Sequence, residues 1–378
     1  MTYELPDYAA MLSDPVRGPA YFAAVRASVH PGSVVADIGA GTGVLGVYAA
    51  ILGARRVFLL EPYLAIGAAV ELARENGVLD RIEIIRELST RVTLPERANV
   101  IVSDLRGVIP LYEQHLEAAI DMRERHLAPG GICIPVRDRL YTALVNDPAL
   151  HARTVGAWAP LPPAIKHGSL TKLFANRWFR THATSDQLLT SPAAWATIEY
   201  GQPAPVFDSS WNTDARRDGT AHGVLLWFDA DLTESIAMSN APSAPRALYG
   251  QAMFPYLEPI AIRAGDQLSG RLRAVLTGDE YEWLWSLRVT RAGHVVAEVR
   301  HTSLHGTPFI TEALARRSES YVPQLATDAE ILRTILESVD GVRDLAAIAE
   351  LIQRRYPETF VTTRDALRFV TRHEDLWA

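Results

Sequence analysis

Cysteine is almost absent from this sequence: Cys133 is the only one among 378 residues. A single thiol excludes an intramolecular disulfide and a metal site built from several thiolates, and it is typical of a reducing cytoplasm. Long apolar runs are lacking as well, so no segment is expected to span a bilayer. Residues 1–17 carry scattered acidic side chains instead of the apolar run of a secretory signal. We therefore expect a cytoplasmic protein without a membrane partner.

Positive charge is also in deficit. The chain has 37 Lys and Arg against 44 Asp and Glu, a formal net charge of −7. Since a nucleic-acid backbone requires a basic footprint, a nucleic-acid partner is not expected. With 48% hydrophobic and 21% charged residues the composition is that of an ordinary globular protein, and the mild acidity fits a small or cationic substrate.

The length fits two or three domains, and the residue pattern changes along the chain. In residues 33–138 short apolar strands alternate with helical stretches, which predicts a Rossmann-type α/β domain with a parallel sheet. Residues 139–322 predict an antiparallel β-barrel or sandwich domain, interrupted by a less regular insertion at about 158–195. Residues 1–32 are expected to form an N-terminal helical lid. The apolar spacing in residues 323–378 predicts a small helical C-terminal domain, which resembles a winged-helix domain.

The strongest motif is the stretch VVADIGAGTG at residues 34–43. It predicts a buried strand followed by a tight turn whose alternate glycines, Gly39, Gly41 and Gly43, let the backbone approach a ligand. The next helix would point its N-terminal amides at that ligand. Eighteen residues further on, Glu61 ends the second predicted strand, where its carboxylate can accept hydrogen bonds from both hydroxyls of a ribose.

The glycine turn is compatible with more than one ligand. Residues 41–46 also match the G-x-G-x-x-G fingerprint, so a nicotinamide dinucleotide is an alternative, as is a glycine-rich turn with no ligand. Asp37, two residues before the first glycine, would repel a pyrophosphate but suits the cationic aminopropyl end of S-adenosylmethionine. The predicted cofactor is therefore S-adenosylmethionine.

A second motif, SDLRGVIPLYE at residues 103–113, follows the fourth predicted strand. Ligands bind at the carboxyl edge of a parallel sheet, and a loop closing on itself could bring Asp104 and Glu113 to one pocket. Two carboxylates can clamp a guanidinium by charge-assisted hydrogen bonds. The clamp would hold the attacking nitrogen in line with the sulfonium methyl, which is catalysis mainly by positioning.

With these motifs the chain resembles the protein arginine methyltransferases over residues 8–289. That family has a similar glycine motif, a double-acid hairpin with the same nine-residue separation, and a similar barrel. The resemblance implies that Glu113 and Asp104 are catalytic, that Arg17 binds the cofactor carboxylate, and that Met11 lies beside the methyl group. It places Ser89 near the adenine. It also implies an insertion that serves as a dimerisation arm, and hence a homodimer.

Several residues depart from that family pattern. Asp104 stands where the family has Glu, and Leu248 stands in place of a His in the barrel loop, next to Tyr249. Tyr8 replaces another His before Met11. Tyr8, Tyr249 and His115 are candidate substrate contacts, although a surface histidine at a helix start is an equally good interpretation of His115.

The predicted function is N-methylation of an arginine guanidinium, either in free arginine or another small guanidine or in a peptide. The altered barrel loop and the acidic charge favour a small acceptor. Two alternatives are methylation of another small amine or hydroxyl, and a weakly active cofactor-binding regulator. His301 and His305 have no nearby acidic cluster, so no metal site is expected.

Overall fold

The computed structural model describes residues 4–200, 206–308, 315–316, 318–373 and 376–377. Outside the described residues lie 1–3 of the predicted lid, 201–205, 309–314 and 317 of the predicted barrel domain, and 374–375 and 378 near the C-terminus. The chain divides into two compact units, residues 1–308 and 309–378. None of the helices in the described part of the chain has the length and apolar character needed to cross a membrane.

The first unit begins with two helices, α1 (Leu5–Leu12) and α2 (Arg17–Ser28). Asp14 lies between them, and its Oδ1 accepts hydrogen bonds from the backbone amides of Val16 and Arg17 at 2.9 and 2.6 Å. This contact satisfies amides that a helix start leaves unpaired. Because Tyr21 and Val25 on α2 are fully buried, the second helix is anchored in the core.

A five-stranded parallel sheet follows, with strand order β3-β2-β1-β4-β5. Successive side chains of β1 supply two cores, since Val35 packs with α3 while Ala36 packs with Met122 of α5. The elements are β1 (Val34–Ile38), α3 (Val44–Ile51), β2 (Arg56–Leu60), α4 (Gly67–Glu75), β3 (Ile82–Ile85), β4 (Ala98–Ser103), α5 (His115–His126) and β5 (Leu127–Ile134). The predicted Rossmann-type domain is confirmed.

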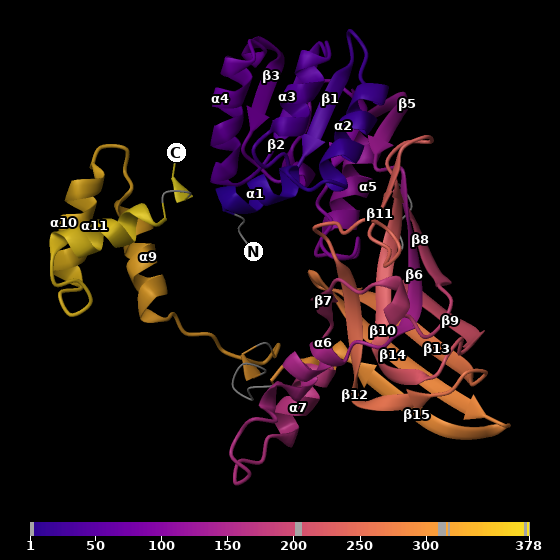
Figure 1. The fold of residues 1–378 in the computed structure, drawn as a ribbon. Helices are drawn as coiled ribbons and strands as arrows, with labels where there is room; N and C mark the ends of the chain where they lie inside the picture. Colours follow the sequence, from indigo (N-terminus) through magenta and orange to yellow (C-terminus); the bar gives the residue numbers. More distant parts are fainter. Residues whose placement is uncertain (1–3, 201–205, 309–314, 317, 374–375, 378) are drawn as a thin grey trace. The chain divides into compact units, whose positions relative to one another are not determined.

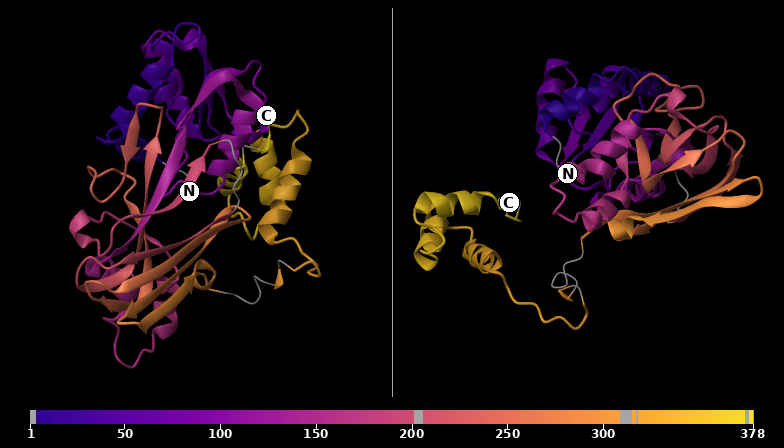
Figure 2. Two further views of the ribbon diagram at one scale, coloured as in Figure 1. Left: turned by 90° about the vertical axis from the view of Figure 1, so that its right-hand side faces the viewer. Right: turned by 60° about the horizontal axis from the view of Figure 1, so that its bottom comes forward.

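Two antiparallel sheets form the rest of the unit, at the opposite end from the parallel sheet in Figures 1 and 2. The first has the order β7-β12-β10-β6-β8, with β11 beside β10, and the second has the order β15-β14-β13-β9. Their bounds are β6 (Arg137–Val145), β7 (Phe179–Thr181), β8 (Ala193–Glu199), β9 (Val206–Asp214), β10 (Gly219–Asp231), β11 (Ala237–Ser239), β12 (Gln251–Ile262), β13 (Gln267–Thr277), β14 (Glu280–Arg291) and β15 (His294–Thr302).

Aromatic side chains join these two sheets. The rings of Phe254 in β12 and Trp283 in β14 lie 4.9 Å apart, and Trp195 in β8 lies 5.8 Å from Trp283. Trp283 and Trp285 are buried, as the alternating pattern of β14 predicts. The strand pairings form two separate sheets with a shared core, so among the described residues the predicted barrel is an open, sandwich-like pair of sheets.

The predicted insertion at residues 158–195 follows β6 and extends into the start of β8 (Figure 1). It is preceded by α6 (Pro148–Arg153) and contains α7 (Gly168–Ala175) and β7. Two of its large apolar side chains are exposed, Ile165 at 49% and Leu170 at 36%. These residues leave an apolar surface on the segment that the sequence predicts to be a dimerisation arm.

The second unit contains α9 (Thr327–Ser338), α10 (Leu345–Arg355) and α11 (Thr363–Thr371). Ile331, Ile348, Ile352 and Val370 are among the residues of its own small core. Asp340 turns the chain between α9 and α10, because its Oδ1 accepts from the amides of Val342 and Arg343. The predicted helical C-terminal domain is therefore present.

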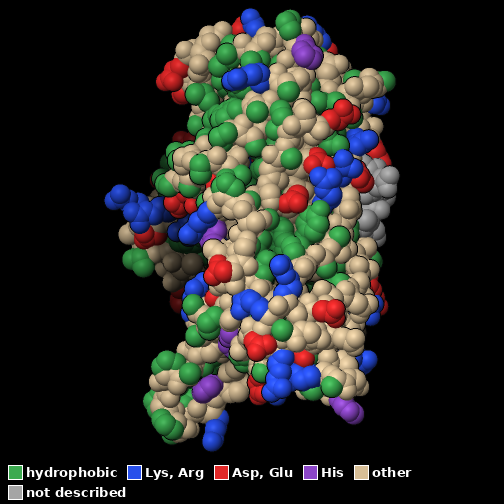
Figure 3. Space-filling view, turned by 45° about the vertical axis from the view of Figure 1, so that its right-hand side comes forward, with side chains coloured by type: hydrophobic (Ala, Val, Ile, Leu, Met, Phe, Trp, Pro, Cys, Tyr) green, Lys and Arg blue, Asp and Glu red, His purple; other side chains and the backbone are tan. Residues whose placement is uncertain are grey.

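Over the face in Figure 3, acidic and basic side chains are interspersed, as the small net charge suggests.

Candidate functional site

The turn between β1 and α3 has the backbone that its glycines predict. Gly39, Gly41 and Gly43 have φ values of +65°, +55° and +74°, a region that other residues rarely adopt. A Cβ at Gly41 would overlap the ring of Tyr8, and one at Gly39 would overlap Leu105. The predicted substrate residue Tyr8 therefore lies directly against the glycine turn.

Two buried carboxylates flank this turn. The Glu61 carboxylate accepts from the amides of Gly41 at 3.0 Å and Tyr63 at 3.1 Å, and Asp37 Oδ2 accepts from the amide of Gly46 at 3.0 Å. Burial raises the pKa of Asp37 to about 7, against the opposing effects of the Gly46 amide and the charge of Arg17. A turn bordered by two acids fits a nucleoside with a cationic tail better than a pyrophosphate.

The lid supplies Arg17 to the same region. Its Nε is paired with Asp104 Oδ2, and its Nη1 donates to the Met11 carbonyl at 3.2 Å. Met11 itself is half-buried on α1, and through this hydrogen bond its backbone helps to hold Arg17. Ser89, the predicted adenine neighbour, is buried in a short 3-10 turn, and its carbonyl accepts from Arg125 at 3.0 Å.

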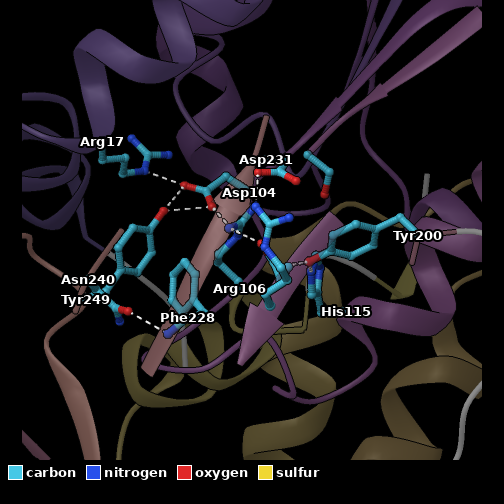
Figure 4. Close-up of polar contacts among 12 residues, drawn as sticks. Arg17, Asp104, Arg106, His115, Tyr200, Phe228, Asp231, Asn240 and Tyr249 are labelled. Carbon is cyan, nitrogen blue, oxygen red and sulfur yellow. Dashed lines mark hydrogen bonds and ion pairs between the residues drawn. The ribbon is translucent and has the colours of Figure 1, made fainter. Parts of the chain in front are cut away.

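Asp104 comes directly after β4, at the carboxyl edge of the parallel sheet, as predicted. Both of its oxygens are already occupied, because Tyr249 Oη donates to them at 2.8 and 2.7 Å and Arg17 contacts Oδ2 (Figure 4). Arg106 Nε lies 3.3 Å from Oδ1. Burial alone would raise the pKa of Asp104, but the charges of Arg17 and Arg106 lower it below its usual value. Asp104 is thus an ionised, fully engaged carboxylate.

The residue motifs did not predict the roles of Arg106 and Asp138. Their side chains are completely buried, and Arg106 Nη1 lies 2.9 Å from Asp138 Oδ1. Arg106 Nη2 also donates to Tyr21 Oη at 3.1 Å, and its guanidinium lies 5.2 Å from the centre of the Phe228 ring. In the sequence, this ion pair could have been suspected only because Asp138 lies within a strand segment and Arg106 lies within the hairpin of residues 103–113.

His115 extends the same buried network from the start of α5. Its Nε2 lies 3.1 Å from Tyr200 Oη, and Tyr200 Oη donates to Asp138. Because that hydroxyl gives its proton to Asp138, His115 Nε2 is the donor toward Tyr200. Burial and the charge of Arg106 lower the pKa of His115 to about 3, so the ring is neutral. The interpretation of His115 as a surface histidine is wrong, since only 3% of it is exposed.

Glu113 differs from Asp104 in its exposure, its backbone conformation and its contacts. It is exposed, it has a φ of +44°, and among the described residues its carboxylate has no hydrogen-bond or ion-pair partner. The structure therefore brings Tyr249, Arg17 and Asp104 together, but Asp104 and Glu113 share no partner. The joint clamp stays a prediction. Among the described residues no group of His, Cys, Asp and Glu could hold a metal ion.

Two family models match the chain. The arginine methyltransferase oligomerization subdomain matches residues 137–280, and the ribosomal protein L11 methyltransferase family (PrmA) matches residues 22–133. The first model covers most of the two antiparallel sheets, and the second covers the second half of α2 and nearly all of the parallel sheet.

Curated relatives match across both regions. The chain is 30% identical over 285 residues to a "Probable histone-arginine methyltransferase CARM1" of Oryza sativa subsp. indica, covering 70% of this chain and 53% of that protein. It is 26% identical over 272 residues to "Protein arginine N-methyltransferase 1" of Schizosaccharomyces pombe, covering 69% of this chain and 79% of that protein. The chain spans about half the length of the first of these curated relatives.

Solved structures share the fold. A chain of the Trypanosoma brucei PRMT1 enzyme-prozyme heterotetrameric complex with AdoHcy matches with a TM-score of 0.71 at 21% identity, covering 79% of this chain and 98% of that one. Arabidopsis thaliana protein arginine methyltransferase 10 matches with a TM-score of 0.67 at 23% identity, with the same coverage.

Proposed function

The chain belongs to the protein arginine methyltransferase-like family, and on that premise we propose that it transfers a methyl group from S-adenosylmethionine to an arginine guanidinium. The observation that carries the proposal is the pairing of Arg17, from the lid, with Asp104 at the sheet edge beside the glycine turn. This pairing joins the region suited to the cofactor to the acid hairpin of residues 103–113.

The cofactor is proposed to bind along the glycine turn. Glu61 would accept the ribose hydroxyls with the lone pairs that the Gly41 and Tyr63 amides leave free. Asp37 and Arg17 would hold the ammonium and carboxylate of the methionine end. When bound, the cofactor supplies a methyl group on a positively charged sulfur.

The acceptor guanidinium is proposed to bind Glu113, the one acid of the hairpin whose carboxylate has no described partner. A guanidinium is a poor nucleophile because its pKa lies above about 12 and its charge is delocalised. Glu113 would draw that charge toward two nitrogens and orient the third toward the methyl group. Asp104 would act mainly by positioning Arg17 and Tyr249.

We propose an arginine within a polypeptide as the acceptor, in line with what the names of the curated relatives say of those proteins. The sequence features favour free arginine or another small guanidine, and these compounds are tested as acceptors in the same assay. A homodimer in the cytoplasm is also proposed, and the match to an oligomerization subdomain supports the association of subunits.

The test is Glu113→Gln, which keeps the size of the side chain and removes its charge. We expect the rate of methyl transfer to an arginine peptide to fall by about 100-fold or more, because the clamp acts on the reacting group. Cofactor affinity, measured by isothermal titration calorimetry, should remain within about twofold. Glu117→Gln, an exposed acid on α5, is the matched control and should retain wild-type turnover.

Other outcomes would assign a different function. Turnover by Glu113→Gln at the wild-type rate would reject the guanidinium clamp. Cofactor binding without methylation of any guanidine would favour the regulatory alternative, and methylation of a small amine or hydroxyl would favour a different acceptor on the same fold.

A further inference from the structure

A basic hollow lies in the first unit, outside the residues described so far. It has a volume of about 480 Å³, and its walls come from the β6–α6 turn, the end of α6, β7 with the residues after it, and the loop before β12. The lining residues are Asp147, Arg153, Arg180, Thr181, His182, Gln187 and Arg246.

The charges of this hollow are unbalanced. Arg153, Arg180 and Arg246 are exposed, and among the described residues none of them has an ion-pair or hydrogen-bond partner. The single acid in the lining, Asp147, is 6% exposed and is already engaged. It accepts from the Leu150 amide at 2.9 Å and from Thr181 Oγ1 at 3.0 Å. Three guanidinium groups therefore face a single carboxylate in one cavity of a protein whose net charge is −7.

The pKa of His182 reflects its burial and the positive charge around the hollow. Burial lowers the pKa of its ring, and the positive charges of Arg246 and Arg180 lower it further. Both arginines are therefore close enough to act on the same side chain, and neither forms an ion pair with an acid of the described residues. A bound anion would relieve their mutual repulsion, and arginine is well suited to hold carboxylate or phosphate oxygens in paired hydrogen bonds.

One short segment joins the hollow to Tyr249 of the candidate site. Arg246 lies three residues before Tyr249, whose hydroxyl contacts Asp104. Three residues span at most about 11 Å of extended chain. Gly250, the residue after Tyr249, lies directly against two lining residues of the hollow. A Cβ at Gly250 would lie 3.2 Å from both Arg180 Cγ and His182 Cε1. A residue near the target arginine in a bound peptide could therefore reach the hollow.

We propose that this hollow binds an acidic side chain of the acceptor polypeptide, close in sequence to the arginine that is methylated. The inference rests on the proposed function, because it specifies the substrate of that site. It makes Arg180 and Arg246 specificity residues that contact the acceptor away from the reacting atoms. The same groups would accept the phosphate of a phosphorylated residue, which is a second source of the same chemistry.

The experiment compares peptides of equal length that carry one arginine and, two to four residues away, two Glu, two Gln or one phosphoserine. Binding is measured first, by fluorescence anisotropy, with wild type and with the double variant Arg180→Gln/Arg246→Gln. Wild type should bind the Glu peptide at least about tenfold more tightly than the Gln peptide, and the double variant should lose that preference. Arg300→Gln is the control, since Arg300 is exposed on β15 and likewise has no described partner.

Steady-state methylation of the same peptides separates the two proposals. A Glu-peptide KM that rises about tenfold in the double variant but not in Arg300→Gln supports the hollow. Methylation with equal KM for the Glu and Gln peptides would overturn the inference while leaving the proposed function intact. A Glu preference in binding without any methylation would keep the hollow and reject the proposed function. If the phosphoserine peptide binds more tightly than the Glu peptide, and the double variant loses that difference, phosphate is the preferred anion.

Discussion

At the scale of single residues, the acid hairpin of residues 103–113 contains two carboxylates in unlike surroundings. Asp104 is buried and bound by Arg17 and Tyr249, whereas Glu113 is exposed with no described partner. A carboxylate whose oxygens are occupied can take a new guanidinium only by releasing an existing donor. This difference is the reason why Glu113 is the proposed acceptor contact and Asp104 a proposed positioning residue.

The buried pair of Arg106 and Asp138 leads to a stability prediction. Arg106→Met leaves Asp138 without its cation, and breaking a buried ion pair in this way costs about 3–5 kcal/mol. Asp138→Asn should also destabilise, because it leaves the buried Arg106 guanidinium with only the longer contact to Asp104, at 3.3 Å, as an ion pair. The double variant should be less destabilised than the sum of the two, by at least about 1 kcal/mol, in the free energy of unfolding from urea titration.

Arg288→Met is the control for that measurement. Arg288 pairs with Glu298 at 3.1 Å, but both side chains are about half exposed. Such a surface pair contributes at most about 1 kcal/mol. Additive effects of the two buried substitutions would show that Arg106 and Asp138 do not act as a pair.

At the scale of elements, the turn from β1 to α3 depends on the lid helix α1 as well as on its own glycines. Gly41 has a positive φ, its amide donates to Glu61, and the ring of Tyr8 packs against its Cα. The proposed cofactor site is therefore completed by Tyr8, a side chain more than 30 residues earlier in the sequence.

Gly41→Ala tests this arrangement. The new methyl group would overlap Tyr8, and an alanine at positive φ is strained by about 1–2 kcal/mol. We expect the Kd for S-adenosylhomocysteine, measured by calorimetry, to rise at least about tenfold. Gly67→Ala is the matched control, because a Cβ there meets no atom within 4 Å and the residue begins helix α4. Equal affinity in both variants would contradict a close fit of Tyr8 over the turn.

At the scale of the whole molecule, the chain has two units with separate cores. The first unit carries every residue of the candidate site and the basic hollow. Its insertion at residues 158–195 exposes apolar side chains with no partner assigned to them by the fold, which is typical of surfaces that associate.

The substitutions Ile165→Glu and Leu170→Glu, made together, test whether this segment is a dimerisation arm. Two carboxylates in an apolar interface would be desolvated without partners, so we expect a dimer to dissociate into monomers in sedimentation velocity. Val295→Glu is the control, since Val295 is 56% exposed on β15. A dimer that survives the arm substitutions, or that is lost in the control, would place the interface elsewhere.

Local sequence alone determined much of this protein. The apolar strand before Asp37, the alternate glycines and the acid at the end of β2 predicted the parallel sheet and its turn. They did so because backbone conformation at glycine and the periodicity of apolar residues are local properties. The alternation of β14 likewise predicted its buried tryptophans.

The tertiary structure decided what the charged residues do. Asp104 meets Arg17 and Tyr249 from segments 87 and 145 residues away, and His115 meets Tyr200 from 85 residues away. Whether a carboxylate is free or engaged, and whether a histidine is neutral, depends on burial and on such distant partners. Hence the motif located the acid hairpin, but only the packed chain distinguished its two acids.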